Sequence, residues 1–491
     1  MTPFWVYFTL VAYAILGTVV AYLSRRNIGR GMTEFFLANR TIGGLLGALT
    51  YSATTYSAFM MIGLAGYTYK GGVGALGFEL IYLSGLVLAV FFGPRFWLAG
   101  QRYGYISPAE MLAHRFQSRW VGMAAALAAL VFLIPYSAVQ LMGIGYLLNG
   151  LSHGAIPYLA GILIAGALAI IWAWIAGLRS VAWTDALQSI VMIIAAAGVL
   201  FYAVYHLLGG WTTFTATLEQ DYPQWLTVPG PGFFNFQAFL GLTLPWFFFC
   251  LSNPQVSQRL FAPPSLRSMR VMLRGFLVFG FLYTLISVLW GFSTLVLEPG
   301  LKSPDMATPT LLGSAGIPPA LALIAMAGIM AAAISTIDSI LLTLSSMFAR
   351  DVYRPLRPSI SEDQELAVGK FIIPVITAAA LAFAYLRLDL VATLSVAAST
   401  GLLVTVPATF AVFFWKRATA AGALASIAGG ALVALYLQFG RLQPLGIWPG
   451  VWTLLASTAL LLLVSFLSPP PTGADAYVEG IKKELEAKQV L

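Results

Sequence analysis

Charged residues and cysteine are scarce in this sequence of 491 residues. Charged residues make up 9% of the chain, whereas a soluble globular protein carries about 25%. The single cysteine, Cys250, cannot form an intramolecular disulfide, and the three histidines do not combine with it in a zinc-site spacing. The scarcity of charge excludes an ordinary soluble domain. The lack of a Cys/His cluster argues against a membrane enzyme built on a metal.

Hydrophobic residues fill 59% of the chain and gather into long runs. A helix needs about 20 mostly apolar residues to cross a bilayer. We therefore predict an all-α polytopic membrane protein in a lipid bilayer. On this criterion it has about 13 transmembrane helices, near 4–23, 42–68, 75–98, 120–148, 157–178, 182–208, 233–258, 271–296, 319–348, 369–386, 390–415, 420–438 and 449–467.

Basic residues are distributed unequally between the two sides of the predicted bundle. With the N-terminus outside, the outer connections hold only Lys70, Lys302, Arg387 and Arg441 of the 26 Lys and Arg. The inner connections hold the rest, including Arg25, Arg26, Arg30 and Arg259. Because Lys and Arg mark cytoplasmic loops, we expect an outer N-terminus, an inner C-terminus and a multi-pass location in the cell (inner) membrane. This topology explains the net charge of +8 without a nucleic-acid partner.

The stretch AAAISTIDSILL, residues 331–342, places Asp338 inside a predicted span. Ionisable groups in membrane spans tend to face the bundle interior or an ion path. One helical turn carries an oxygen-rich band formed by Ala332, Ser335, Thr336, Asp338 and Ser339. Hydroxyls, carbonyls and carboxylates are ligands of hard cations, so the band indicates ion binding or a proton relay. The alternative is an ordinary helix contact, in which Ser and Thr aid packing.

A second polar stretch, TYSATTYSAFMMIG at residues 50–63, lies in the second predicted span. Hydroxyl-bearing and β-branched residues with glycines nearby predict a helix that unwinds for a few residues; the alternative is a polar helix seam. Unwound backbone occurs at this depth only where it is buried or lines a cavity. Its carbonyls can bind a cation, and the N–H groups of the next half-helix can bind an anion.

The seventh predicted span is also interrupted, in our interpretation by Gly241 and Pro245. Spans 2 and 7 run in opposite directions, five spans apart, which is typical of a five-plus-five inverted repeat. We predict a first helix and loop at 1–41, repeats at 42–208 and 209–418, two accessory helices at 419–467 and a cytoplasmic tail at 468–491. The tail is expected to be a solvated helix or disordered.

Two further acids fall within predicted spans. Glu79 lies near an outer helix end, from which we expect it to reach the interface. Asp185 is interpreted either as an interfacial cap or partner of Arg179, or as part of an ion site. No Lys or Arg is predicted deep inside a span, so a substrate carboxylate would meet no buried cation.

Four stretches in the observed order resemble the sodium:solute symporter family: SATTYSAFMMIGLAGYTYKGG, GLRSVAWTDALQ, NPQVSQRLFA and AAAISTIDSILLTLSSMFARDVY. The resemblance implies a leucine-transporter-like fold and sodium-coupled import of a small organic solute by alternating access, with no enzyme activity. The pieces FFLANRTIG and YGYISPAEMLAHRF look like the monocarboxylate and pantothenate branches, which favours a carboxylate. Thr55 replaces an acid of the proline branch. The alternatives are a proline-like amino-acid symporter, a proton-coupled carrier or a symporter-like sensor.

The resemblance also implies site residues for sodium and solute. The main sodium site would use the carbonyls of Ala53, Tyr56 and Ala332 and the hydroxyls of Ser335 and Thr336. A second cation site would recruit Asp185, Asp338 and Ser339, together with Ser335. The solute would contact Thr54, Thr55, Ser57, Tyr136, Gln140, Trp246 and Phe247, with Tyr56 as further apolar cover. The oligomeric state is left open.

Overall fold

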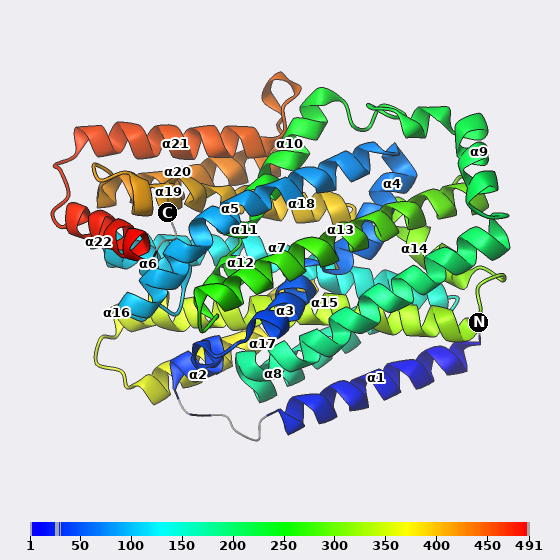
Figure 1. Cartoon of the computed structure of the whole chain (residues 1–491), viewed down its shortest axis with the longest axis horizontal. Helices are drawn as coiled ribbons and strands as arrows, with labels where there is room; N and C mark the ends of the chain where they lie inside the picture. The colour runs from blue at the N-terminus through cyan, green and yellow to red at the C-terminus, as the bar shows by residue number, and fades with distance from the viewer. Residues whose placement is uncertain (1, 25–28, 30, 489–491) are drawn as a thin grey trace.

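The structure is a computed structural model that describes residues 2–24, 29 and 31–488. Arg25, Arg26 and Arg30, which enter the prediction of orientation, lie outside the described residues. Within the described part the chain is helical and contains no strand (Figure 1).

Eleven helices in the described part are long and apolar enough to cross a membrane. They are α1 (Pro3–Leu23), α5 (Gly74–Tyr103), α7 (Arg119–Leu151), the two parts of α8 (Tyr158–Tyr202), α13 (Leu266–Leu297), α15 (Pro319–Met347), α17 (Glu362–Leu386), α18 (Val391–Leu402) continued by η8 (Leu403–Thr405) and α19 (Val406–Phe414), α20 (Ala420–Phe439) and α21 (Pro449–Leu467). Gly177, with φ +59°, divides α8, because glycine adopts this left-handed conformation readily. These helices make the chain a multi-pass membrane protein.

The second predicted span is broken in its middle. It consists of α3 (Gly44–Thr55), a π-helical turn η2 (Phe59–Leu64) and α4 (Ala65–Gly71). The break at residues 56–58 follows two threonines, whose β-branched side chains fit a helix poorly. The Ser57 Oγ then accepts the N–H of Phe59 at 3.2 Å, which stabilises the start of the second piece.

The seventh predicted span is broken as well, but at another place than expected. Helix α10 (Phe236–Phe247) runs through Gly241 and Pro245, and short helices α11 (Phe249–Ser252) and α12 (Pro254–Ser257) follow. Asn253, with φ −91° and ψ 108°, separates α11 from α12. Placing the interruption at Gly241 and Pro245 was wrong. The residue before a proline is driven out of the helical conformation, and here that residue is Asn253, before Pro254.

Short helices connect the long ones. They are α2 (Met32–Leu37), η1 (Ala38–Arg40), α6 (Pro108–Arg115), η3 (Ala203–Leu207), α9 (Trp211–Asp221), η4 (Pro223–Leu226), η5 (Gln258–Phe261), η6 (Pro304–Met306), α14 (Ala307–Gly313), η7 (Phe348–Tyr353), α16 (Arg354–Leu356), η9 (Pro444–Gly446) and α22 (Ala474–Ala487).

Helix α15 runs through the interior of the bundle. It contacts α3, α7, α8 and α17, and every residue from 325 to 347 except 327 is buried. Figure 1 places α1 at one edge of the bundle and α20 with α21 at the opposite edge. A helix that is polar on one turn and surrounded by other helices can present that turn to a site without exposing it to lipid.

The C-terminal tail forms a helix, which was one of the two expectations, but the apolar face of this helix is docked on the bundle and not solvated. Helix α22 buries Tyr477, Val478, Ile481 and Leu485, and it contacts α5 and α19. The Tyr477 ring lies 5.9 Å from the ring of His114 on α6. Burial lowers the pKa of the His114 imidazole from its usual value, with the nearby carboxylate of Glu110 opposing the shift.

An aspartate on the opposite side caps α18. The Asp305 Oδ2 accepts the N–H of Val391 at 3.0 Å. Burial raises the pKa of Asp305 to about 6 against the effect of this hydrogen bond. The carboxyl therefore ties η6 to the first residue of α18.

Candidate functional site

The break after α3 and one turn of α15 meet inside the bundle. The Ser335 Oγ lies 3.0 Å from the Ala53 carbonyl oxygen and 3.1 Å from that of Ala332. The Thr336 Oγ1 lies 3.3 Å from the carbonyl oxygen of Ala53, 3.1 Å from that of Thr54 and 2.9 Å from that of Ala332. Oxygens from two helices thus gather at one point, and they are of the types that a hard cation binds.

The carbonyls on the α3 side are free because the helix ends there. Tyr56, the first residue after α3, has φ −87° and ψ 82°. In a continuous helix the N–H of Ala58 would donate to the Thr54 carbonyl; it donates instead to Gln140 Oε1 at 3.0 Å. The break therefore leaves the carbonyls of Ala53 and Thr54 to partners on α15.

A buried arginine joins two of the residues predicted for the second cation site. Arg259 is 4% exposed. Its Nη2 lies 3.6 Å from Asp185 Oδ2 and 2.5 Å from Ser339 Oγ, and its Nη1 donates to Thr50 Oγ1 at 3.1 Å. Thr50 in turn donates to Asp185 Oδ2 at 2.6 Å. Arg259 was assigned to an inner connection, and that assignment to a loop outside the bundle was wrong, because residues 253–262 stay buried.

Asp185 is neither a cap at the membrane interface nor a partner of Arg179, which were the two alternatives to an ion site. Its side chain is fully buried, about two helical turns after the kink at Gly177. Arg179 pairs instead with Glu34, with Nε 2.8 Å from Oε1. Both alternatives were wrong, because the kink starts a new helix segment before Asp185 and carries this residue into the bundle.

Three buried acceptor oxygens beside this arginine cluster lack hydrogen-bond donors in the described part of the chain. They are Asp185 Oδ1, Asp338 Oδ1 and Gln188 Oε1. The two carboxyls interact electrostatically with each other and with the hydroxyl of Tyr13, to which Gln188 Nε2 donates at 3.2 Å. A buried acceptor without a donor is unfavourable by about 1–3 kcal/mol. These oxygens are therefore suited to a cation.

The start of the second half-helix is already capped by the protein's own groups. Gln140 Oε1 accepts from Ala58, as above, and the Gln140 Nε2 donates to the Tyr136 carbonyl at 3.4 Å. The Ser57 Oγ accepts from Phe59. A substrate carboxylate could reach the N–H of Ala58 only by displacing Gln140.

Aromatic rings cover this half-helix. The Trp246 ring has its centroid 5.0 Å from that of Phe59, 5.3 Å from Phe78 and 5.4 Å from Phe249. Phe247 packs against the phenylalanine that follows it and is only half-buried, so the structure does not bring it into this cluster.

The remaining residues predicted to contact the solute do not all lie in one cluster. The Thr54 Oγ1 lies 2.9 Å from Ser339 Oγ, which ties it to the arginine cluster. The Thr55 Oγ1 is buried and has no partner among the described residues. The Tyr56 ring stacks on Phe276 at 5.1 Å. Of these residues, Thr55 and Tyr56 each keep a hydroxyl without a hydrogen-bond partner in the described part of the chain.

Glu79 does not reach the membrane interface. It is 1% exposed, and its Oε2 lacks a hydrogen-bond partner in the described structure, as do the hydroxyls of Tyr56 and Tyr82. The expectation was wrong because Glu79, five residues into α5, faces the bundle instead of the lipid. The aromatic cluster thus adjoins polar atoms with unused hydrogen-bonding capacity.

Sequence reasoning missed Arg259, Gln188 and Glu79 as members of these clusters. Arg259 stands in the quoted stretch NPQVSQRLFA, but hydropathy assigned it to a loop. Gln188 is three residues after Asp185, which places both on one helix face, and this spacing could have revealed it.

Comparison with known proteins gives consistent matches. The sequence model of the sodium:solute symporter family matches residues 35–430. The chain is 31% identical to the sodium/pantothenate symporter of Escherichia coli, over 92% of this chain and 95% of that protein. It is 24% identical to the high-affinity proline transporter of Bacillus subtilis, over 90% and 94% of the two chains. A substrate-bound, outward-open sodium-coupled sialic acid symporter has a similar fold, with a TM-score of 0.78, 20% identity and coverage of 95% of this chain and 98% of that one.

Proposed function

Because the chain belongs to the sodium:solute symporter family, we propose that it imports a small organic carboxylate of the monocarboxylate or pantothenate type together with sodium. The proposal includes about 13 spans, two inverted repeats, an outer N-terminus and an inner C-terminus in the cell (inner) membrane. The likeness to the pantothenate symporter supports the carboxylate class.

One observation carries the proposal: the meeting of α3 and α15 at the hydroxyls of Ser335 and Thr336. We assign the main sodium site to these hydroxyls and the carbonyls of Ala53, Tyr56 and Ala332. The Thr54 carbonyl, 3.1 Å from Thr336 Oγ1, is a further ligand candidate. A cation there would replace hydrogen bonds between the two helices by stronger ion–oxygen contacts, and so hold α3 against α15.

The second cation site is proposed at Asp185, Asp338 and Ser339, with Gln188 added. Their acceptors without donors support cation binding. Arg259 already supplies a positive charge to Asp185 Oδ2 and a donor to Ser339. Arg259 and sodium therefore compete for this carboxylate, and the arginine must swing away before a cation uses both Asp185 oxygens.

The solute site is proposed beside the second half-helix. Trp246, Tyr136 and the rings around them would cover the apolar part of the solute. The N–H of Ala58 would bind its carboxylate once Gln140 turns away, and Thr55 and Ser57 would add hydroxyl contacts. A helix N-terminus favours an anion.

Transport would follow from the preference of sodium for one arrangement of the bundle. An ion shifts a conformational equilibrium only by its difference in affinity for the two states. Joining α3 to α15 supplies such a difference, since an ion between them is lost when the helices separate. Each sodium that enters along a membrane potential adds about 2.3 kcal/mol per 100 mV.

Uptake by proteoliposomes tests this function. Labelled pantothenate, a short monocarboxylate and proline are supplied with a sodium gradient or a proton gradient imposed separately. Accumulation of a carboxylate driven by sodium alone is expected. Accumulation driven only by protons would contradict sodium coupling, and sodium-driven uptake of proline alone would contradict the carboxylate class.

A further inference from the structure

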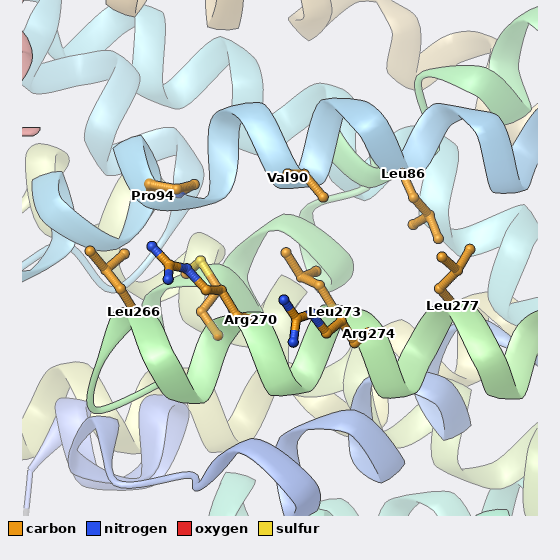
Figure 2. A pocket seen from close by; sticks show the side chains of 9 residues that line it. Leu86, Val90, Pro94, Leu266, Arg270, Leu273, Arg274 and Leu277 are labelled. Atoms are coloured by element: carbon orange, nitrogen blue, oxygen red, sulfur yellow. The ribbon is translucent and has the colours of Figure 1, made fainter. Parts of the chain in front are cut away.

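An apolar groove with two arginines runs along the lipid-facing side of α5 and α13. Its volume is about 370 Å³, and its lining includes Leu86 and Val90 of α5 and Leu273 and Leu277 of α13. Figure 2 shows Arg270 and Arg274 among the leucines on the side of α13 that borders the groove.

The two arginines have no charge partner in the described part of the chain. Both side chains are exposed. Among the described residues neither Arg270 nor Arg274 takes part in a hydrogen bond or an ion pair. A guanidinium offers five N–H donors in a planar fork that matches phosphate oxygens. The groove therefore presents unused donors for an anion beside an apolar wall.

Both arginines lie nearer the first residue of α13 than Leu277 does, although Leu266 precedes them and Leu273 lies between them. Arg270 and Arg274 lie about 6 Å and 12 Å from the first residue of the helix, and Leu277 lies about 16 Å from it. In the proposed orientation this end is cytoplasmic. The arginines are then at headgroup depth in the inner leaflet, where anionic lipids attract basic side chains. Leu277, with Leu86 opposite it in Figure 2, is at the depth of acyl chains.

We propose that this groove binds one anionic glycerophospholipid, with its phosphate on Arg270 and Arg274 and an acyl chain along Leu273, Leu277 and Val90. A free phosphate would leave the apolar wall uncovered, whereas a lipid satisfies both parts of the groove. The neighbouring surface supports a lipid occupant, since the exposed Val87 and Val278 already face the bilayer. The inference rests on the proposed orientation only for the choice of leaflet.

Native mass spectrometry of the purified full-length chain tests the inference without any transport step. The chain is titrated with phosphatidylglycerol or phosphatidylcholine, and the apparent Kd of the first bound lipid is measured. Each basic residue near the membrane surface contributes about fivefold to the affinity. The variant Arg270→Gln with Arg274→Gln should therefore bind the first phosphatidylglycerol about 30-fold more weakly than the unchanged chain.

Two further variants separate a specific groove from general surface charge. Arg267→Gln removes a neighbouring exposed arginine that does not line the groove, and it should keep the tight site. Leu273→Trp fills the groove and keeps both arginines, and it should lose the tight site.

Four results would overturn the inference. They are equal affinity for the two lipids in the unchanged chain, unchanged affinity in the double arginine variant, unchanged affinity in Leu273→Trp, and displacement of the lipid by inorganic phosphate. If the purified chain forms a dimer that is lost when groove residues are substituted, the groove is instead a contact between two copies of the chain. Because no solute or gradient is used, failure here is distinct from failure of the proposed transport.

Discussion

Replacing Arg259 with glutamine tests whether a guanidinium and a sodium ion compete for Asp185. The charged groups approach to 3.6 Å. Two unit charges at about 4 Å attract by about 4 kcal/mol at an effective dielectric constant of about 20. Removing one partner of a buried ion pair destabilises a protein by about 3–5 kcal/mol, because the other charge remains buried. Arg259→Gln should therefore unfold at a markedly lower temperature in sodium-free buffer.

Sodium should reverse much of this loss. In Arg259→Gln the ion meets an unpaired Asp185 carboxylate and displaces no arginine, so it should bind at least about tenfold more tightly, which corresponds to about 1.4 kcal/mol. A ligand at 100 times its Kd stabilises the folded state by about 2.7 kcal/mol. The assay is thermal unfolding in detergent over a sodium titration, with choline replacing sodium.

Two variants control this experiment. Arg179→Gln breaks another ion pair, with Glu34, and should lower stability without enlarging the sodium effect. Asp185→Asn combined with Arg259→Gln removes both charges and should be less destabilised than Arg259→Gln alone. If sodium stabilises the unchanged chain and Arg259→Gln equally, the proposed competition is refuted.

Three smaller predictions follow from other contacts. Gln140→Glu places a carboxylate on the N–H of Ala58. Because a charge-assisted hydrogen bond is about twice as strong as a neutral one, a carboxylate solute should displace this side chain less readily, and its KM should rise roughly tenfold. An unchanged KM would contradict this solute site. Asp305→Ala should destabilise the chain by about 0.5–2 kcal/mol through loss of the cap on Val391. Because the pKa of Asp305 is raised to about 6 in the folded state, stability should fall as the pH rises from about 4 to 6, and Asp305→Asn, which keeps an acceptor, should abolish this fall. Thermal unfolding against pH measures both. Because its pKa is lowered in the folded state, neutral His114 stabilises the docked α22 above about pH 6.5, and this contribution should fade as pH drops further; limited proteolysis of the tail should quicken on acidification, and equal acceleration in His114→Gln would contradict that assignment.

Much of the fold could be predicted because hydropathy and hydroxyl content are properties of short stretches of sequence. Apolar runs of spanning length mark the long helices, and the Thr–Tyr–Ser stretch marks the break after α3. The break of the seventh span was harder to locate. Gly241 and Pro245 are tolerated within α10, whereas Asn253 leaves the helix because a proline follows it.

The site could be predicted only where its residues share a short stretch. Ser335 and Thr336 lie on one turn, and the family resemblance linked them to Ala53. Arg259 reaches Asp185 through a chain segment that is buried against expectation, and hydropathy assigns any arginine beside a span to the nearest loop. A side chain's partner across the bundle is a property of tertiary packing, which local periodicity does not contain.

Equilibrium binding of radioactive sodium to the purified chain tests the central claim most directly. Ser335→Ala with Thr336→Ala should weaken sodium binding roughly 100-fold or more, because an interaction of a hydroxyl with a charged group contributes about 1.5–3 kcal/mol. Ser345→Ala is the matched control, since this hydroxyl donates to the Leu342 carbonyl of its own helix, and the variant should bind sodium as the unchanged chain does. Sodium binding of equal affinity in the double variant would contradict the claim that α3 and α15 meet around a sodium ion.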